Sequence, residues 1–343
     1  METPEVFTRN ILPEVSRTFA LNIPVLPEPL DLVVTVAYLL CRIADTLEDE
    51  GAGAMPLRMD LFADLANLVT LPDGWEGQAD TFVATARNVL RPQAPPAEVR
   101  LLEGTRTVLR ALADLPPWTH PHVARCVGTM TRGMSEVTQE LEGRHEVNGL
   151  ANLEALMTYC YYVAGTVGEM LTGLFMDFSA SAKATAGVLE PRAQAFGRAL
   201  QLTNILKDVR EDLDRGICWL PRDRLEAHGL TVKTLVAPET RTRAVALLDE
   251  LVAVARREVE SAFEYSLALP VEESGLRLFC LWPLFFAVLT LGKLEHNPAV
   301  FDPAPVKVSR DAIKRVMVAT QENVASDAAL RSLYQALQAP RAA

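Results

Sequence analysis

Four acidic side chains occupy the last six residues of the stretch YLLCRIADTLEDE, directly after an apolar run. Tyr38, Arg42, Asp45 and Asp49 follow one another at intervals of four, three and four residues, so a helix would place them on one face. Two carboxylates one helical turn apart can share a hard divalent cation such as Mg2+, which prefers oxygen ligands and keeps several waters. A solvated helix end would show the same pattern, so this first acidic stripe (Asp45 and Asp49) leaves both interpretations open.

A second stretch, QLTNILKDVREDLDRGICWLP, places Gln201, Asn204, Asp208 and Asp212 at intervals of three, four and four residues. If the helices that carry the two stripes are neighbours, four aspartates face one another across a cavity. Such crowding of carboxylates is hard to sustain without bound cations. Mg2+ that bridges a diphosphate also makes the diphosphate a good leaving group. The first stripe and this second acidic stripe (Asp208 and Asp212) together therefore predict Mg2+, a diphosphate, and apolar helix faces that hold a hydrocarbon chain.

The elements that must position these side chains are predicted to be helices throughout. Apolar residues recur at helical spacing in nearly every long segment, strand signals are weak, and the 22 prolines fall mostly between the periodic segments. We therefore expect an all-α protein that forms a single domain over residues 1–343, with an ordered core at about 9–338. The expected helices cover residues 31–50, 56–70, 79–90, 97–114, 119–140, 152–178, 187–213, 239–267, 272–297 and 309–338.

The composition narrows the class of protein and its surroundings. Hydrophobic residues make up 49% and charged residues 22% of the chain, as in ordinary globular proteins. A net charge of -11 disfavours a nucleic-acid partner, because phosphates would be repelled. Five widely spaced cysteines without a C-x-x-C pair are typical of a reducing compartment. The N-terminus lacks a signal-peptide pattern, and the longest apolar run, Leu278 to Gly292, is shorter than the ~20 residues of a membrane helix.

Several motifs in one order give the chain a resemblance to a known family. They are SRTF, DTLED, YCYYVAGTVGEM, NILKDVREDLDRG and LFCLWP, at residues 16–19, 45–49, 159–170, 204–216 and 278–283. In these motifs the chain resembles the squalene and phytoene synthase family, whose members join two prenyl diphosphates head to head. The resemblance implies one all-helical domain with the isoprenoid synthase fold, in which both acidic motifs face a central apolar cavity.

The same resemblance assigns roles to the residues of both stripes. It implies that Mg2+ is bound by a set of oxygen ligands, Asp45, Asp49, Asp208, Asp212 and Asn204. Diphosphate contacts are implied for Ser16, Arg17, Tyr38, Arg42, Gln201 and Asn204. A guanidinium suits this task because its donors can bind an anion in a bidentate manner. For Arg42, a plain ion pair with Asp45 or Asp49 is an equally simple interpretation.

Tyr159 matches the family tyrosine that assists diphosphate departure or the proton loss that closes a cyclopropane. Its surroundings also look like a tightly packed core helix, with the small residues Ala164, Gly165 and Gly168. A glycine within a helix costs about 1 kcal/mol relative to alanine. The clustered glycines therefore indicate close approach by another helix or by a ligand.

The two branches of the family differ after the shared first half-reaction. Squalene synthases reduce the cyclopropyl diphosphate with NADPH, whereas phytoene and dehydrosqualene synthases lose a proton. GTVGEM resembles the carotenoid branch, while FCLWP and the segment FDPAPVKVSRD resemble the squalene branch. That segment keeps a lysine and a later arginine, but Ser309 replaces one arginine of the family pattern. The resemblance assigns NADPH contacts to Lys207, Phe279, Lys307 and Arg310, and the balance favours squalene formation from farnesyl diphosphate.

Two alternatives remain beside these branches. A non-catalytic prenyl-lipid binding protein would be expected to lose aspartates from one stripe, and both stripes are intact. A terpene cyclase that ionises a single diphosphate is disfavoured by SRTF and the tyrosine motif. We expect a cytoplasmic monomer or weak homodimer without a nucleic-acid partner or a transmembrane anchor. Peripheral contact with the inner face of the membrane would let it deliver a lipid product.

Overall fold

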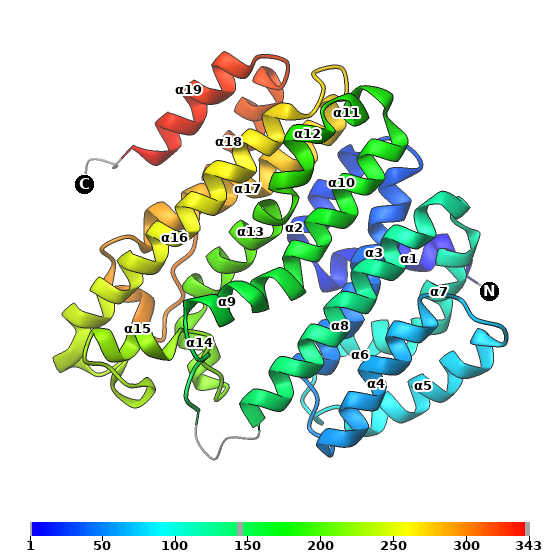
Figure 1. Cartoon of the computed structure of the whole chain (residues 1–343), viewed down its shortest axis with the longest axis horizontal. Helices are drawn as coiled ribbons and strands as arrows, with labels where there is room; N and C mark the ends of the chain where they lie inside the picture. Colours follow the sequence, from blue (N-terminus) through cyan, green and yellow to red (C-terminus); the bar gives the residue numbers. More distant parts are fainter. Residues whose placement is uncertain (1, 143–146, 340–343) are drawn as a thin grey trace. The chain divides into compact units, whose positions relative to one another are not determined.

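The computed structural model describes residues 2–142 and 147–339 (Figure 1). In these ranges the chain is helical, and β pairing is limited to two isolated bridges, Gly51 with Leu90 and Leu150 with Pro221. The prediction of an all-α protein is confirmed. The chain divides into two compact units, Met1–Gln139 with Glu169–Ala180, and Glu140–Gly168 with Ser181–Ala343. The first acidic stripe lies in the first unit and the second stripe in the second, and the expectation of a single domain stays a prediction.

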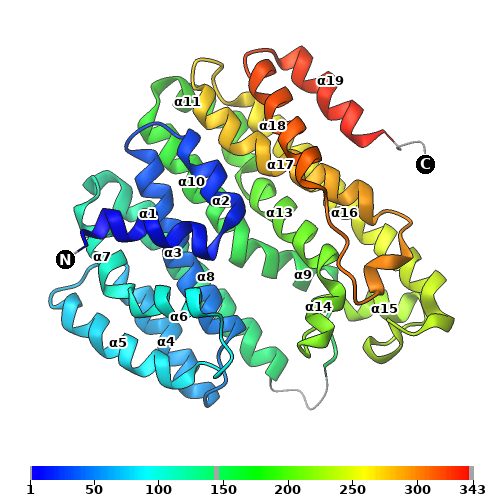
Figure 2. The ribbon, with the colours of Figure 1, turned by 180° about the vertical axis from the view of Figure 1, so that it is seen from behind.

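The first unit is built around helix α3, which contacts α1, α4, α6 and α7. Figures 1 and 2 both show α4 beside α5, and these two helices are also in contact. Its helices are α1 (Pro4–Val15), α2 (Arg17–Asn22), α3 (Leu30–Asp49), α4 (Met55–Leu68), α5 (Trp75–Val89), α6 (Pro96–Glu103), α7 (Thr105–Asp114), and most of α8 (His120–Glu142) and α10 (Thr166–Phe178).

Helix α3 has an apolar face and a polar face, as its sequence pattern predicts. Val33, Ala37, Leu40, Ala44 and Leu47 alternate at intervals of four and three residues, and each is at most 1% exposed. Such a stripe must be buried against other elements to stabilise a helix. The acidic side chains lie on the remaining face and keep partial contact with solvent. The burial of one face therefore fixes the direction of the other.

The second unit is built around α13, α16 and α17, which contact one another. Both views show α16 and α17 side by side (Figures 1 and 2). Its helices are α9 (Leu153–Cys160), the π-helical segment η3 (Tyr161–Gly165), α11 (Ala180–Ala184), α12 (Ala186–Leu189), α13 (Ala193–Lys207), α14 (Val209–Asp214), α15 (Arg222–Ala227), α16 (Arg241–Ala268), α17 (Ser274–Leu294), α18 (Arg310–Asn323) and α19 (Asp327–Gln338). Short 3-10 turns lie in both units. Those of the first unit are Ile23–Val25 and Pro117–Thr119, and those of the second are Glu190–Arg192, Val232–Thr234, Pro238–Thr240 and Pro298–Phe301.

Helix α17 combines length with an apolar composition that would suit a membrane span. In the structure, however, 72% of its most apolar window is buried inside the protein. Phe279, Cys280 and Leu281 are at most 1% exposed. A helix that is apolar on all sides is the expected core of a large helical unit, and α17 has that place here.

Several expected helices are interrupted where a specific residue stops the regular pattern. The expected helix 97–114 divides at Gly104, where an added Cβ would collide with the Phe7 ring of α1. The expected helix 309–338 divides before α19, where the Ser326 side chain accepts a hydrogen bond from the amide of Ala329. The ring contact and this cap depend on tertiary packing and local side-chain geometry, which apolar periodicity does not reveal.

The expected helices 152–178 and 187–213 are also not continuous. The first contains η3, and the second is divided into α12, a 3-10 turn, α13 and α14. Helices α1, α2, α11 and α15 were not expected as separate elements, and α15 follows Pro221 without a side-chain cap. Helices α2, α11 and α15 have only five or six residues, which is too few to show an apolar periodicity.

Candidate active site

Arg42 is the centre of a group of charged side chains in the first unit. Its Nη2 donates a hydrogen bond to the carboxylate of Glu98, which comes from α6. Its Nη1 lies 3.6 Å from Oδ2 of Asp45, one turn further along α3. Thr46 adds a hydrogen bond of 3.4 Å to the other oxygen of Glu98. The guanidinium is thus shared between a carboxylate of the first acidic stripe and a buried carboxylate of another helix.

Asp45 lies in a desolvated environment although 34% of its side chain is exposed. Surrounding protein atoms replace much of the water around this carboxyl, and this desolvation raises the pKa of Asp45 to about 7. Arg42 acts in the opposite direction, while the charges of Asp49 and Glu98 raise the pKa further. A carboxylate whose negative charge is this costly has a strong tendency to accept a cation, and Mg2+ would supply two positive charges.

Ser16 and Tyr38 connect the N-terminal motif to the first acidic stripe. The Ser16 side chain accepts a hydrogen bond from the amide of Phe19 at 3.1 Å and so caps α2. Burial raises the pKa of Tyr38, and a side-chain hydrogen bond to Ser16 acts against this shift. The rings of Phe19 and Tyr38 lie 5.0 Å apart. Arg17 is the first residue of α2 and is exposed. The structure therefore brings SRTF next to the residues of α3 that were expected to act with it.

The second acidic stripe starts at a break between two helices. Asp208 lies between α13 and α14 with φ -101° and ψ 13°, and its amide donates to the carbonyl of Asn204 at 2.9 Å. The Asp212 amide donates to the carbonyl of Asp208, also at 2.9 Å. The Lys207 Nζ lies 3.0 Å from Oδ2 of Asp208. Burial raises the pKa of Asp208, and Lys207 opposes that shift.

The other polar residues of this stripe differ in exposure. Asp212 is 9% exposed, and its Oδ1 lies 3.3 Å from Nη2 of Arg215. Gln201 is partly buried, whereas Asn204 is exposed. The helix break at Asp208 thus leaves one aspartate of the pair at the junction and one within α14. The expectation of one continuous helix over residues 187–213 that carries all four side chains was wrong, because α13 ends at Lys207.

Tyr159 is a buried residue of α9 whose ring is 3% exposed. Its ring stacks on Trp219, with centroids 4.1 Å apart and an angle of 10° between the planes. Trp219 follows the second acidic stripe in the sequence GICWLP, so this contact joins the two motifs inside the second unit. The stack fixes the orientation of the ring that the resemblance assigns to catalysis.

The glycines near Tyr159 allow α13 to approach closely. A Cβ at Gly168 would collide with the carbonyl oxygen of Ala193, and one at Gly197 would collide with the carbonyl of Ala164. Of the two explanations for the clustered glycines, approach by another helix is the one observed. This close packing also orders the start of the helix that leads to the second acidic stripe.

The residues expected to contact NADPH lie in different settings. Lys307 and Arg310 are exposed cations, and Arg310 is the first residue of α18. Ser309 caps α18 by accepting a hydrogen bond from the Ala312 amide at 3.2 Å. The serine that replaces a family arginine therefore has a structural task. Phe279 is 1% exposed, so a direct cofactor contact would require a rearrangement of the core around it.

The donor set of each stripe fits Mg2+ better than a softer metal. Both stripes offer carboxylate oxygens, which hard cations prefer, and Mg2+ usually binds one or two carboxylates together with waters and phosphate oxygens. Within residues 2–142 and 147–339, no group of three or more His, Cys, Asp or Glu side chains converges to form a closed metal cage. An incomplete shell of two carboxylates per stripe is compatible with a metal that arrives with its diphosphate.

Some residues around the site were missed by the sequence reasoning. Glu98 is 56 positions away from Arg42, so no local spacing relates the two. Arg58 and Arg91 contact the carbonyl oxygens at the end of α3, and Trp219 stacks on Tyr159. The sequence held one signal for the arginines, because acids at a helix C-terminus require a compensating positive charge.

Solved structures that are similar to this chain in fold include TcSQS and a dehydrosqualene synthase. A complex of TcSQS with a ligand has a TM-score of 0.81 and 25% identity, and the likeness covers 100% of this chain and 93% of that one. A dehydrosqualene synthase with a ligand has a TM-score of 0.62 at 22% identity, over 94% of this chain and 97% of that one. These likenesses define the class of protein as an all-helical synthase fold.

The model of the squalene/phytoene synthase family matches residues 12–312. The chain belongs to the squalene/phytoene synthase family. A probable squalene synthase of Neurospora crassa is 28% identical over 308 residues, which are 89% of this chain and 60% of that protein. A squalene synthase of Candida albicans is 28% identical over 307 residues, 88% of this chain and 64% of the relative. The chain thus spans less than two thirds of the length of these relatives.

Proposed function

We propose that this protein is a Mg2+-dependent squalene synthase. It condenses two molecules of farnesyl diphosphate head to head to presqualene diphosphate and reduces this intermediate with NADPH to squalene. The observation that carries the proposal is the charged group around Arg42, where Asp45 is desolvated beside a guanidinium and one turn from Asp49. Membership of the family and the relatives named above support the same assignment.

The first acidic stripe and the SRTF motif would bind one end of the substrate. Asp45 and Asp49 would hold Mg2+ in the first unit, and Asp208, Asp212 and Asn204 would hold Mg2+ in the second unit. When bound, Mg2+ would neutralise the diphosphate and improve it as a leaving group. Arg42, whose Nη1 lies 3.6 Å from Asp45, is placed to contact diphosphate oxygens. Ser16, Arg17, Tyr38 and Gln201 would complete the polar contacts.

Tyr159 would act in the first half-reaction. Its stack on Trp219 at 4.1 Å limits the ring to one orientation. A phenol held in this way can donate a hydrogen bond to the departing diphosphate or assist removal of the proton that closes the cyclopropane. The ring is also buried, and a dry surrounding of this kind would keep water from capturing the allylic cation.

NADPH would be bound by the exposed cations of the segment before α18. Lys307 and Arg310 suit the phosphate groups of such a cofactor, and Lys207 would contribute through its own ammonium group. Because Lys207 pairs with Asp208 at 3.0 Å, that ion pair would have to loosen for the contact to form. Phe279 would act indirectly, through the packing of α17.

A phytoene or dehydrosqualene synthase is the second candidate. Ser309 stands where the squalene branch has an arginine, and it is engaged as the cap of α18. A protein of this kind would share the first half-reaction and lose a proton in the second. A non-catalytic prenyl-lipid binding protein is a candidate of another class, although both acidic stripes are retained. We further propose a cytoplasmic monomer or weak homodimer that contacts the membrane peripherally.

Incubation with farnesyl diphosphate tests these candidates directly. The purified chain is incubated with the substrate and Mg2+, with and without NADPH, and the products are identified by mass spectrometry. Squalene that forms only with NADPH supports the proposal. Dehydrosqualene in both reactions, or product only from geranylgeranyl diphosphate, would transfer the protein to the carotenoid branch. Binding of the substrate without any product would favour the lipid-binding alternative.

A further inference from the structure

The C-terminal end of α3 carries an unfavourable concentration of negative charge. The last turn contains Glu48 and Asp49 and no basic residue, and Glu50 follows as the cap. The final carbonyl groups of any helix have no partner within the helix, and the helix dipole adds a partial negative charge there. Without positive groups from elsewhere, this turn would tend to fray, and Asp49 would leave the face that it shares with Asp45.

Arg58 of α4 supplies the first positive group. It is 3% exposed, and its Nη2 donates to the carbonyl oxygen of Glu48 at 3.3 Å. The guanidinium lies directly against Gly51, because a Cβ at that position would be 2.5 Å from Arg58 Nε. The same Cβ would also collide with the carbonyl of Leu47. The turn after α3 thus requires a glycine to admit this arginine.

Arg91 supplies the second positive group from the segment after α5. Its Nη2 donates to the carbonyl oxygen of Asp49, and its Nε lies 3.5 Å from the Glu50 carboxylate. The backbone holds it in place, since the Arg91 amide donates to the carbonyl of Glu50 at 2.8 Å. The Ala52 amide donates to the carbonyl of Val89 at 2.7 Å. The end of α3 is therefore tied to the end of α5 by backbone and side chain together.

We propose that Arg58 and Arg91 form an arginine clamp that positions the first acidic stripe for metal binding. The clamp neutralises the carbonyl end of α3 and keeps its last turn helical, so that Asp49 remains one turn from Asp45. Both arginines donate to backbone carbonyl oxygens of the last turn, Arg58 to that of Glu48 and Arg91 to that of Asp49. They therefore act on the end of the helix through its backbone. This inference rests on the proposed metal-binding function of the stripe.

Arg91→Gln in the full chain is the primary test. The Arg91 side chain is 29% exposed, whereas Arg58 is only 3% exposed, so a change at Arg91 should disturb the fold less. Hydrogen exchange of the backbone amides in residues 46–51 is the readout that needs no activity. Exchange in this segment should become about tenfold faster while α8 is unchanged. The Mg2+ concentration for half-maximal turnover of farnesyl diphosphate should also rise about tenfold, with kcat at saturating Mg2+ within about threefold.

Three further variants make the test specific. Arg91→Lys keeps the positive charge but replaces the planar guanidinium with a single ammonium group. Its Mg2+ affinity should therefore lie between that of Arg91→Gln and that of the unaltered chain. Gly51→Ala should displace Arg58 without changing any charge and should produce the same two effects. Arg106→Gln is the matched control, because it removes an exposed ion pair of the first unit, 2.7 Å from Asp80. This control should alter neither measurement.

Unchanged exchange at the end of α3 in Arg91→Gln would overturn the clamp, whatever the enzyme activity. Faster exchange together with an unchanged Mg2+ requirement would also overturn the clamp. The arginines would then stabilise the last turn of α3 without affecting the binding of Mg2+. If the unaltered chain shows no turnover at all, the proposed function fails instead. The exchange measurement would still decide whether the two arginines hold the turn.

Discussion

Arg42 lies between two carboxylates from different helices, donating to Glu98 of α6 and standing 3.6 Å from Asp45 of α3. Glu98 is 9% exposed, and its two oxygens accept hydrogen bonds from Arg42 and from Thr46. Arg42 therefore has two separable tasks. It neutralises a buried acid of the fold, and it offers its remaining donors to the first acidic stripe.

Arg42→Ala should lower both stability and activity. It leaves Glu98 buried without its cation, which should reduce the free energy of unfolding by about 3 kcal/mol. The double variant Arg42→Ala with Glu98→Ala should recover much of that stability but little of the turnover. Urea unfolding and product formation measure the two effects. Recovery of turnover in the double variant would show that Arg42 has no role beyond neutralising Glu98.

Asp45→Asn and Asp208→Asn should each reduce turnover at least about 100-fold. Under the proposed function, each change removes a carboxylate that would stabilise the charge of the leaving group through Mg2+. Both variants should remain folded, since neither side chain is a core contact. Turnover of farnesyl diphosphate at several Mg2+ concentrations is the measurement. Asp214→Asn is the control on α14, where an exposed carboxylate pairs with Arg210 at 2.9 Å. Rates near those of the unaltered chain in either stripe variant would refute the metal assignment.

Tyr159→Phe should slow the first half-reaction by orders of magnitude while keeping the stack on Trp219. The change removes the hydroxyl and leaves the ring, so the free energy of unfolding should fall by no more than about 1 kcal/mol. Release of inorganic pyrophosphate in a single turnover measures the step. A loss of only about twofold would assign Tyr159 to packing alone.

Lys307→Ala should stop the reaction at the cyclopropyl diphosphate, because the proposed contact with a phosphate of NADPH would be lost while the first half-reaction needs no NADPH. The intermediate should accumulate in the presence of NADPH and be detectable by mass spectrometry. Lys314→Ala, on the neighbouring helix α18, provides a comparison of equal charge. Undiminished squalene formation in Lys307→Ala would remove this residue from the cofactor site.

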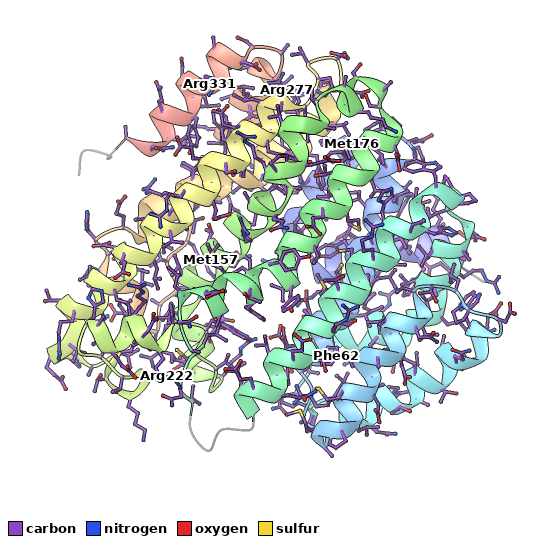
Figure 3. All side chains as sticks on the ribbon, in the orientation of Figure 1. Phe62, Met157, Met176, Arg222, Arg277 and Arg331 are labelled. Atoms are coloured by element: carbon purple, nitrogen blue, oxygen red, sulfur yellow. The ribbon has the colours of Figure 1, made fainter. Side chains whose placement is uncertain are left out.

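A dependence on pH is expected where α19 contacts α16. Arg331, labelled on α19 in Figure 3, donates to Glu264 at 2.9 Å and holds the pKa of that carboxyl below its ordinary value of 4.5. A lowered pKa in the folded state stabilises the protein above the ordinary pKa, and this contribution is lost as the pH falls. Because the pair is largely exposed, it should contribute only about 0.5 kcal/mol.

Urea unfolding of the unaltered chain and of Glu264→Gln at pH 6 and pH 3.5 checks this expectation. The variant should be less stable at pH 6, and the difference in stability should become smaller at pH 3.5, as Glu264 of the unaltered chain takes up a proton. Glu260→Gln, one turn earlier on α16, is the control and should show no such difference. A constant difference between the two proteins at both pH values would contradict the role of the ion pair.

The acidic stripe of α3 shows how far local sequence determines a site. Apolar residues at intervals of three and four residues fix the buried face of the helix, and Asp45 and Asp49 must then share the opposite one. At Asp208 the apolar spacing continues although the helix does not, because α13 ends at Lys207 and the expected continuous helix is broken there. Periodicity detects a face but not a single residue that departs from helical geometry.

The sequence by itself determined the all-helical fold, the composition of both stripes and the family motifs, because these depend on residue type and spacing along one chain. The tertiary structure decided which residues serve those stripes. Glu98 reaches Arg42 from α6, Arg91 reaches Asp49 from the segment after α5, and Trp219 stacks on Tyr159. These contacts join positions far apart in the chain. Burial and long-range packing create them, and no local pattern records which distant side chain will arrive.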